Sequence, residues 1–201
     1  MFPLGAVLLP HEMLPLHVFE ERYREMIATC LAGDGRFGVV LIARGSEVGG
    51  GDVRHDAGTI AAIEVASPTE DGRYGILARG KERLRVHSWL DDAPYPRALV
   101  SLDSDDDPGD LAVEIANALA QLRKVRELWA ELGEGPALPE QVALGADFSE
   151  QIWRLCSATP LGPLDRQRLL ESNGLRDRLA LLAGEIADRQ SDFEAMLEQR
   201  P

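Results

Sequence analysis

The chain has 201 residues, of which 45% are hydrophobic, and a formal net charge of -13 that is spread over both halves. This length and composition are sufficient for one large folded domain or two small ones. Nucleic-acid affinity depends mainly on Lys and Arg neutralising phosphates, so the acidic balance argues against nucleic acid as the main partner. No apolar run approaches the roughly 20 residues that span a bilayer, and no basic leader is present. We therefore expect a cytoplasmic protein with no membrane partner.

The first residues alternate between extended and helical patterns. An apolar extended segment covers Phe2–Leu9, and alternating side chains predict a strand over Leu14–Val18. From Phe19 the apolar residues recur at helical spacing, and the face they form consists of Phe19, Tyr23, Met26, Ile27, Cys30 and Leu31. Gly33 stops this helix, and Phe37–Ala43 is predicted as the next strand.

Short strands dominate the segment that follows. We expect strands at Thr59–Ala66, Arg73–Arg79 and Arg97–Asp103, with a further short one after Gly80, which we expect at a bulge or sharp bend. The glycine run at residues 49–51 has strands on both sides, which favours a flexible hairpin loop over a phosphate cradle. Six or so strands with one inserted helix predict an α+β chain that begins with a small antiparallel β-barrel or pseudo-barrel.

An acidic segment at residues 103–110 reads as a linker, so we expect one domain over residues 1–105 and a helical bundle over residues 106–201. Gly133 ends a long helix, and Asp147 with Glu150 forms a capping box for a short one. Pro163 fits the first turn of another helix, which Gly174 closes. The last long helix has near-heptad spacing, which fits a bundle face or a dimer contact and leaves monomer and dimer open.

Residue patterns for catalysis and metal binding are missing from the sequence. Activated serine or cysteine nucleophiles need a nearby base, and the four His and two Lys are scattered without such a pairing. The His residues also lack ligand-like spacing. Cys30 and Cys156 sit in predicted helices among apolar residues, which is typical of buried free thiols. We therefore expect no enzyme activity, cofactor or metal.

Arginines and tryptophans offer the remaining candidate contacts. Four arginines gather in one region of the predicted sheet and another lies on the inserted helix; the set is Arg22, Arg73, Arg79, Arg83 and Arg85. They fit either structural ion pairs, with Glu20, Glu64 or Glu82 as partners, or a polar rim around a recognition groove. The three tryptophans divide in the same way between core packing and binding anchors.

Several ordered motifs resemble a known family. FPLGAVLLPHEMLPLHVFEERYREMI, FGVVLI, GTIAAI, DGRYGILARGKERLRV and YPRALVSL are similar, in order and spacing, to the amino-terminal substrate-binding domain of the ATP-dependent protease Lon. LCSATPLGPLDRQRLLESNGLRDRLALL resembles the helices that follow that domain. The resemblance covers essentially the whole chain and implies a PUA-like pseudo-barrel followed by a helical bundle. GxxxxGK[ST] and a Ser-Lys peptidase region are missing, so the chain looks like a stand-alone, non-catalytic member.

This resemblance implies a module that binds unfolded or partially folded polypeptide segments, with a protease or chaperone machine as a further partner. The groove is expected where the two domains meet. The residues that we expect to contact peptide are Phe19, Arg22, Tyr23, Arg79 and Trp153. Because PUA-like barrels include RNA-recognition domains, an RNA or nucleotide binder is the alternative, although the acidic balance weighs against it.

Overall fold

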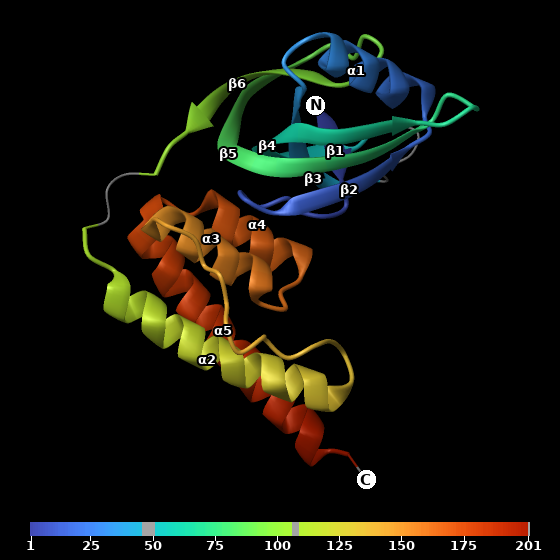
Figure 1. Cartoon of the computed structure of the whole chain (residues 1–201). Coiled ribbons are helices and arrows are strands. Elements are labelled where there is room, and N and C mark those ends of the chain that lie inside the picture. Colours follow the sequence, from blue (N-terminus) through green and yellow to red (C-terminus); the bar gives the residue numbers. More distant parts are fainter. Residues whose placement is uncertain (46–50, 106–108, 201) are drawn as a thin grey trace. The chain divides into compact units, whose positions relative to one another are not determined.

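The computed structural model describes residues 1–45, 51–105 and 109–200 (Figure 1). Gly49 and Gly50 of the expected glycine loop lie outside these residues. The chain divides into two compact units, Met1–Ser104 and Asp105–Pro201, which we call unit 1 and unit 2. In the described part of the chain, no helix combines the length and the apolar character that crossing a membrane requires.

The described residues of unit 1 form one six-stranded mixed sheet and one helix. Its elements are β1 (Phe2–Leu4), β2 (Met13–Val18), α1 (Glu21–Ala32), β3 (Arg36–Arg44), β4 (Val53–Pro68), β5 (Tyr74–Leu90) and β6 (Arg97–Asp103). The strand order is β1-β3-β4-β5-β2, and β6 also pairs with β5. The described strands and helices of the two units together make an α+β chain.

The first strand runs parallel to its neighbour. Phe2 and Leu4 of β1 lie beside Val39 and Leu41 of β3 in parallel register, whereas the other strand pairs are antiparallel. Strand β2 and helix α1 connect β1 to β3, and a crossover of this kind is what parallel neighbours require. The prediction of a wholly antiparallel sheet is therefore wrong at β1, which is also shorter than the extended segment expected there.

Strand β5 continues through Gly80, where we expected a bulge or sharp bend between two strands. The expected bulge is present on β5, because the three steps from Gly80 to Arg83 face only the two steps from Thr59 to Ala61 on β4. The first half of β5 pairs with β2 and the second half pairs with β6, so both strands use the same side of β5. The small residue at position 80 therefore marks the place where β5 changes neighbours.

Helix α1 covers the core of unit 1. Tyr23, Met26 and Ile27 are buried, and the Tyr23 ring lies 4.3 Å from that of Phe2, measured between centroids. The helix begins at Glu21 with Glu20 as its N-cap, so Phe19 precedes it and remains 51% exposed. The prediction that the apolar face of this helix begins at Phe19 was therefore wrong by two residues.

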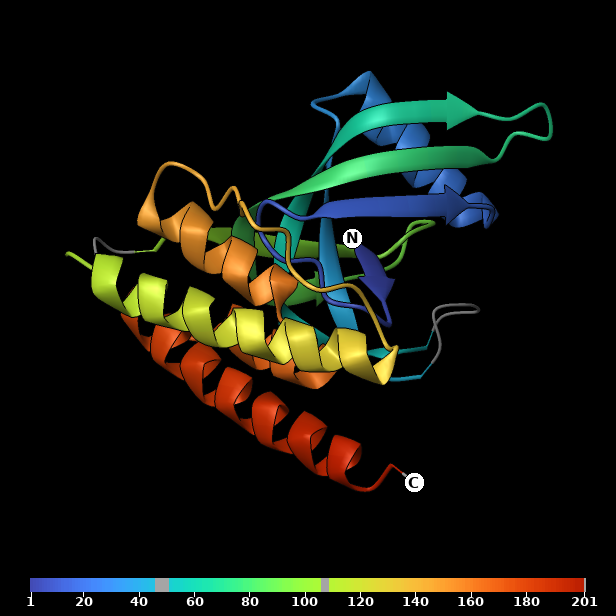
Figure 2. The same cartoon turned by 60° about the horizontal axis from the view of Figure 1, so that its bottom comes forward.

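The described residues of unit 2 form four helices packed against one another. They are α2 (Ala112–Leu132), α3 (Phe148–Ala158), α4 (Pro163–Glu171) and α5 (Gly174–Glu198), and α2 lies beside α5 along much of its length (Figure 2). The near-heptad residues of α5 are largely buried within the unit: Leu175, Leu179, Leu182, Ile186 and Phe193. Packing inside the chain therefore accounts for that spacing.

Local signals mark several helix ends in unit 2. Asp147 accepts a hydrogen bond from the Glu150 amide at 2.8 Å, which confirms the predicted cap of α3. Gly133 ends α2 in the left-handed conformation with φ of 80°. Gly174 begins α5 rather than closing α4, whose C-cap is Ser172, so the prediction was wrong about which helix this glycine bounds.

The two cysteines are expected to resist thiol reagents in the folded protein. Cys156 is fully buried, and this burial raises the pKa of its thiol to about 12; burial also raises the pKa of half-buried Cys30. Because the thiolate is the reactive form, we expect Cys156 to react about a thousandfold more slowly than an exposed thiol at pH 8. Alkylation followed by mass spectrometry, with urea-unfolded protein as control, measures this. Rapid native modification of Cys156 would contradict its burial.

Candidate functional site

A recess in unit 1 lies between the two strands at the ends of the sheet order. It encloses about 190 Å³ and is lined by Phe2, Pro3, Leu4, Pro15, Leu16, His17, Val18, Phe19, Glu20 and Tyr23. Among the strands of the described residues, β1 is bonded only to β3, and β2 only to β5. Because both strands line one recess, the sheet curves until its two edges face each other without pairing.

Both edge strands contain a proline. Pro3 lies in β1 and Pro15 lies in β2, and proline has no backbone N–H to donate to a further strand. Proline at an edge is a common device against strand addition. The recess is therefore suited to accept side chains rather than to extend the sheet.

Phe19 marks the exposed end of the recess. It lies between β2 and α1, and its ring centroid is 6.3 Å from that of His17. Half of the side chain is in contact with solvent, although phenylalanine is a residue that folding usually buries. The recess is smaller than the roughly 300–1,000 Å³ of typical small-molecule pockets, so it fits one large side chain.

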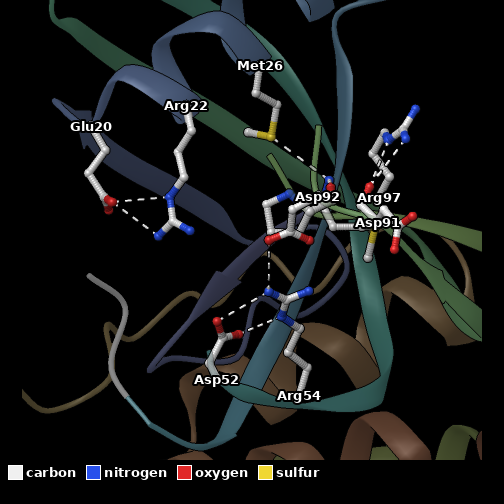
Figure 3. A network of polar contacts seen from close by, with 10 residues as sticks. Glu20, Arg22, Met26, Asp52, Arg54, Asp91, Asp92 and Arg97 are labelled. Atoms are coloured by element: carbon white, nitrogen blue, oxygen red, sulfur yellow. Dashed lines mark hydrogen bonds and ion pairs between the residues drawn. The ribbon is translucent and has the colours of Figure 1, made fainter. Parts of the chain in front are cut away.

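Arg22, Glu20 and Tyr23 form a polar border beside the recess. The Arg22 guanidinium lies 4.5 Å from the centroid of the Tyr23 ring and pairs with the Glu20 carboxylate at 3.1 Å (Figure 3). Tyr23 itself is 3% exposed, and burial raises the pKa of its hydroxyl to about 12. Tyr23 therefore supports the wall of the recess, whereas Arg22 and Glu20 meet the solvent.

Other arginines of the sheet are engaged in ion pairs. The Arg79 side chain bonds the Glu64 carboxylate at 2.5 Å, and this bond lowers the pKa of Glu64. Arg73 pairs with Asp71, and both Arg83 and Arg85 lie within 4 Å of the Asp103 carboxylate. These contacts confirm the ion-pair interpretation, although the acidic partners of the last three arginines differ from those expected. Arg79 does not line the recess.

Each tryptophan of the chain lies beneath an arginine. The guanidinium carbon of Arg54 is 4.6 Å from the centroid of the Trp89 ring, and that of Arg126 is 4.5 Å from the Trp129 ring. Arg54 also pairs with Asp52 and Asp92, which Figure 3 shows on either side of its guanidinium group. These two tryptophans are half-buried.

Trp153, the tryptophan we expected at the binding site, is 1% exposed and lies 3.9 Å beneath Arg178 in the core of unit 2. The recess thus contains Phe19 and Tyr23 from the expected set, with Arg22 beside it. Sequence reasoning missed its other walls, Phe2, Leu4 and Pro15. The parallel pairing of β1 has no local signal, although a proline in each edge strand was visible in the sequence.

Comparison with known families decides the assignment. Residues 1–188 match the model of the ATP-dependent protease La (LON) substrate-binding domain. The chain belongs to this family. It is 28% identical to Lon protease 2 of Herpetosiphon aurantiacus over 188 residues, which cover 90% of this chain and 22% of that protein. This chain is also 24% identical to a LON peptidase N-terminal domain and RING finger protein of Schizosaccharomyces pombe, and the matched region covers 43% of that protein.

A solved structure supports the fold across nearly the whole chain. The crystal structure of a Lon N-terminal domain protein from Xanthomonas campestris aligns with a TM-score of 0.68 and 28% identity, covering 91% of this chain and 95% of that one. The chain thus spans about a fifth of the length of the Lon protease it matches and nearly all of the separate Lon N-terminal domain protein.

Proposed function

We propose that the protein is a non-catalytic module that binds unfolded or partially folded polypeptide segments through the recess between β1 and β2. The observation that carries the proposal is Phe19, half-exposed at an apolar recess that fits one large side chain. Membership of the Lon substrate-binding family supports a polypeptide ligand. A large apolar side chain of the client enters the recess while Phe19 packs against its neighbours.

The composition of the recess implies loose selectivity. Most of its lining residues are apolar, and the Arg22–Glu20 pair supplies one polar border. Apolar anchors contribute most of the binding energy at interfaces, and a single anchor gives weak binding. Useful affinity then comes from several anchors along one client, or from attachment to a protease or chaperone machine that raises the effective concentration.

The same proposal covers the architecture and location of the protein. We assign unit 1 to the PUA-like pseudo-barrels and unit 2 to the helical bundles, with the boundary near residue 105. The facing edges of the sheet support the first assignment, and the α2–α5 pairing supports the second. We also propose that the protein acts in the cytoplasm and that it catalyses no reaction itself.

Changing Phe19 to alanine is expected to weaken peptide binding about thirtyfold, because truncating an aromatic anchor costs about 2 kcal/mol. Leu31→Ala is the matched control, since Leu31 is 45% exposed on α1 and does not line the recess. The measurement is fluorescence anisotropy with labelled peptides rich in Leu and Phe, beside the same peptides carrying Ser at those positions. Tyr23→Ala is unsuitable because removing a buried aromatic destabilises the fold.

Two results would overturn this proposal. The first is equal peptide affinity for Phe19→Ala, Leu31→Ala and the unchanged protein. The second is tight binding of a structured RNA pool at physiological salt without measurable peptide binding, which would favour the RNA interpretation. Preference for the apolar peptides, lost in Phe19→Ala and kept in Leu31→Ala, supports the recess as the site.

A further inference from the structure

Strand β6 has an unpaired edge that differs from the edges at β1 and β2. It pairs with β5 along one side, from Arg97 opposite Leu90 to Asp103 opposite Arg83, and it has no second strand partner among the described residues. Its sequence, RALVSLD, contains no proline. No residue of β6 therefore lacks a backbone N–H, and the alternate residues whose N–H and C=O groups point away from β5 form a template for another strand.

Apolar side chains on the core-facing side of β6 remain uncovered. Val100 lies opposite Val86, and Leu102 lies opposite Leu84, so each pair shares one face of the sheet. Val86 and Leu84 are 7% and 1% exposed, whereas Val100 and Leu102 are 37% and 57% exposed. The core thus ends at β5, and the apolar face of β6 extends beyond it.

The sequence of β6 is complementary to itself when two copies run antiparallel around Val100. In that register Val100 faces its own copy, Ala98 faces Leu102, and Leu99 faces Ser101. Arg97 then faces Asp103, so the strand ends carry opposite charges on both sides of the symmetry axis. Residues directly opposite in an antiparallel pair have Cβ atoms about 5 Å apart, which is close enough for these ion pairs.

We propose that the protein forms a symmetric dimer in which the β6 strands of two copies pair antiparallel around Val100. A two-fold axis between the two Val100 residues joins the sheets of both copies and places Val100 beside its symmetry mate and Leu102 beside Ala98 of the other copy. The charge pattern selects a second copy over an arbitrary client strand, because only a sequence with an acid six residues after a base satisfies both ends. The prolines in β1 and β2 disfavour the same kind of strand pairing at the edges formed by those two strands.

The two charged residues remain accessible for a second partner. Arg97 donates to the Asp91 carbonyl oxygen at 3.2 and 3.3 Å, which leaves the third guanidinium nitrogen available. The Asp103 carboxylate is 3.3 Å from Arg85, and its side chain is 36% exposed. A carboxylate accepts several hydrogen bonds, so Asp103 can keep Arg85 while it binds Arg97 of the other copy.

Charge reversal on the full chain tests this dimer. Sedimentation equilibrium should detect a species of twice 22.0 kDa in the unchanged protein. Arg97→Asp and Asp103→Arg should each weaken dimerisation about tenfold, because each places like charges opposite one another at both ends. The double variant should recover most of the affinity, since the exchanged charges face each other again. Recovery would show that the single variants act through the contact between copies. Loss of the Asp103–Arg85 ion pair could not explain their effect, because the double variant also lacks Asp103.

Circular dichroism serves to check that each variant is folded. Leu102→Ser is a variant without charge change that should also weaken the dimer. An unchanged protein that stays at 22.0 kDa at every concentration up to roughly millimolar would overturn the proposal. A dimer that none of these substitutions weakens would exclude β6, and a double variant no better than the single ones would exclude this register. Peptide binding at Phe19 is measured separately, so the two proposals fail independently.

Discussion

Replacing Arg178 with alanine is expected to lower the free energy of unfolding of unit 2 by about 3–5 kcal/mol, the usual cost of removing one partner from a buried ion pair. Arg178 is 0% exposed although it carries a permanent charge. It donates to the Asp105 carboxylate at 3.0 Å and to the carbonyl oxygens of Leu169 and Ser172 at 3.0 and 3.1 Å. Its guanidinium group also stacks on Trp153.

This position connects four parts of unit 2 through one side chain: the segment before α2, helix α3, the end of α4 and helix α5 itself. The variant removes the charge that Asp105 faces and the donors that two backbone oxygens use. Trp153 loses the group that covers its ring, so a cavity forms beside it. Arg178→Lys is expected to recover only part of the loss, because one ammonium cannot reproduce the planar fork.

Thermal unfolding followed by circular dichroism measures the effect, and a loss of this size should lower the melting temperature of a unit this small by at least about 12 °C. Arg176→Ala is the matched control on the same helix. Arg176 pairs with Glu114 at 3.5 Å through side chains that are both at least half exposed, so its loss should cost under about 1 kcal/mol. Equal melting temperatures for the two variants would contradict the role assigned to Arg178.

Sequence patterns predicted best those features that depend on neighbouring residues. The cap at Asp147, the start of α4 at Pro163 and the end of α2 at Gly133 each depend on the conformation of one residue and a nearby backbone group. Such signals are complete within a few residues of sequence, so they could be read without knowledge of the fold.

Features that depend on distant residues were harder to predict. The parallel pairing of β1 with β3 joins segments almost forty residues apart, and the recess follows from that pairing. Arg178 looked like any helical arginine, because the carboxylate that makes its burial possible, Asp105, lies 73 residues away. Phe19 matched the spacing of a buried helical face, but the helix starts two residues later and leaves it exposed.

Gly80→Ala is expected to destabilise unit 1 by about 3 kcal/mol, at the upper end of the usual cost of overpacking a core. A Cβ at this position would lie 2.2 Å from the carbonyl oxygen of Leu9 and 3.1 Å from its carbon. These are backbone atoms, so no side-chain rotation relieves the overlap. The Gly80 amide donates to the Glu12 carbonyl oxygen at 2.8 Å, and its own carbonyl oxygen accepts from the His11 amide at 2.9 Å, which holds the two segments together.

The matched control is Gly75→Ala in the same strand, where a Cβ would meet its nearest atom, the Ser67 carbonyl oxygen, at 3.9 Å. We expect that variant to lie within about 1 kcal/mol of the unchanged protein, because alanine there also reduces the entropy of the unfolded chain. Hydrogen exchange followed by mass spectrometry separates the two units, and Gly80→Ala should accelerate exchange in β2 and β5 without affecting α2–α5. Similar exchange in both variants would show that the segment from Leu9 to Glu12 can move away from β5. The change from β2 to β6 as the neighbour of β5 would then not depend on the close approach of Leu9 to Gly80.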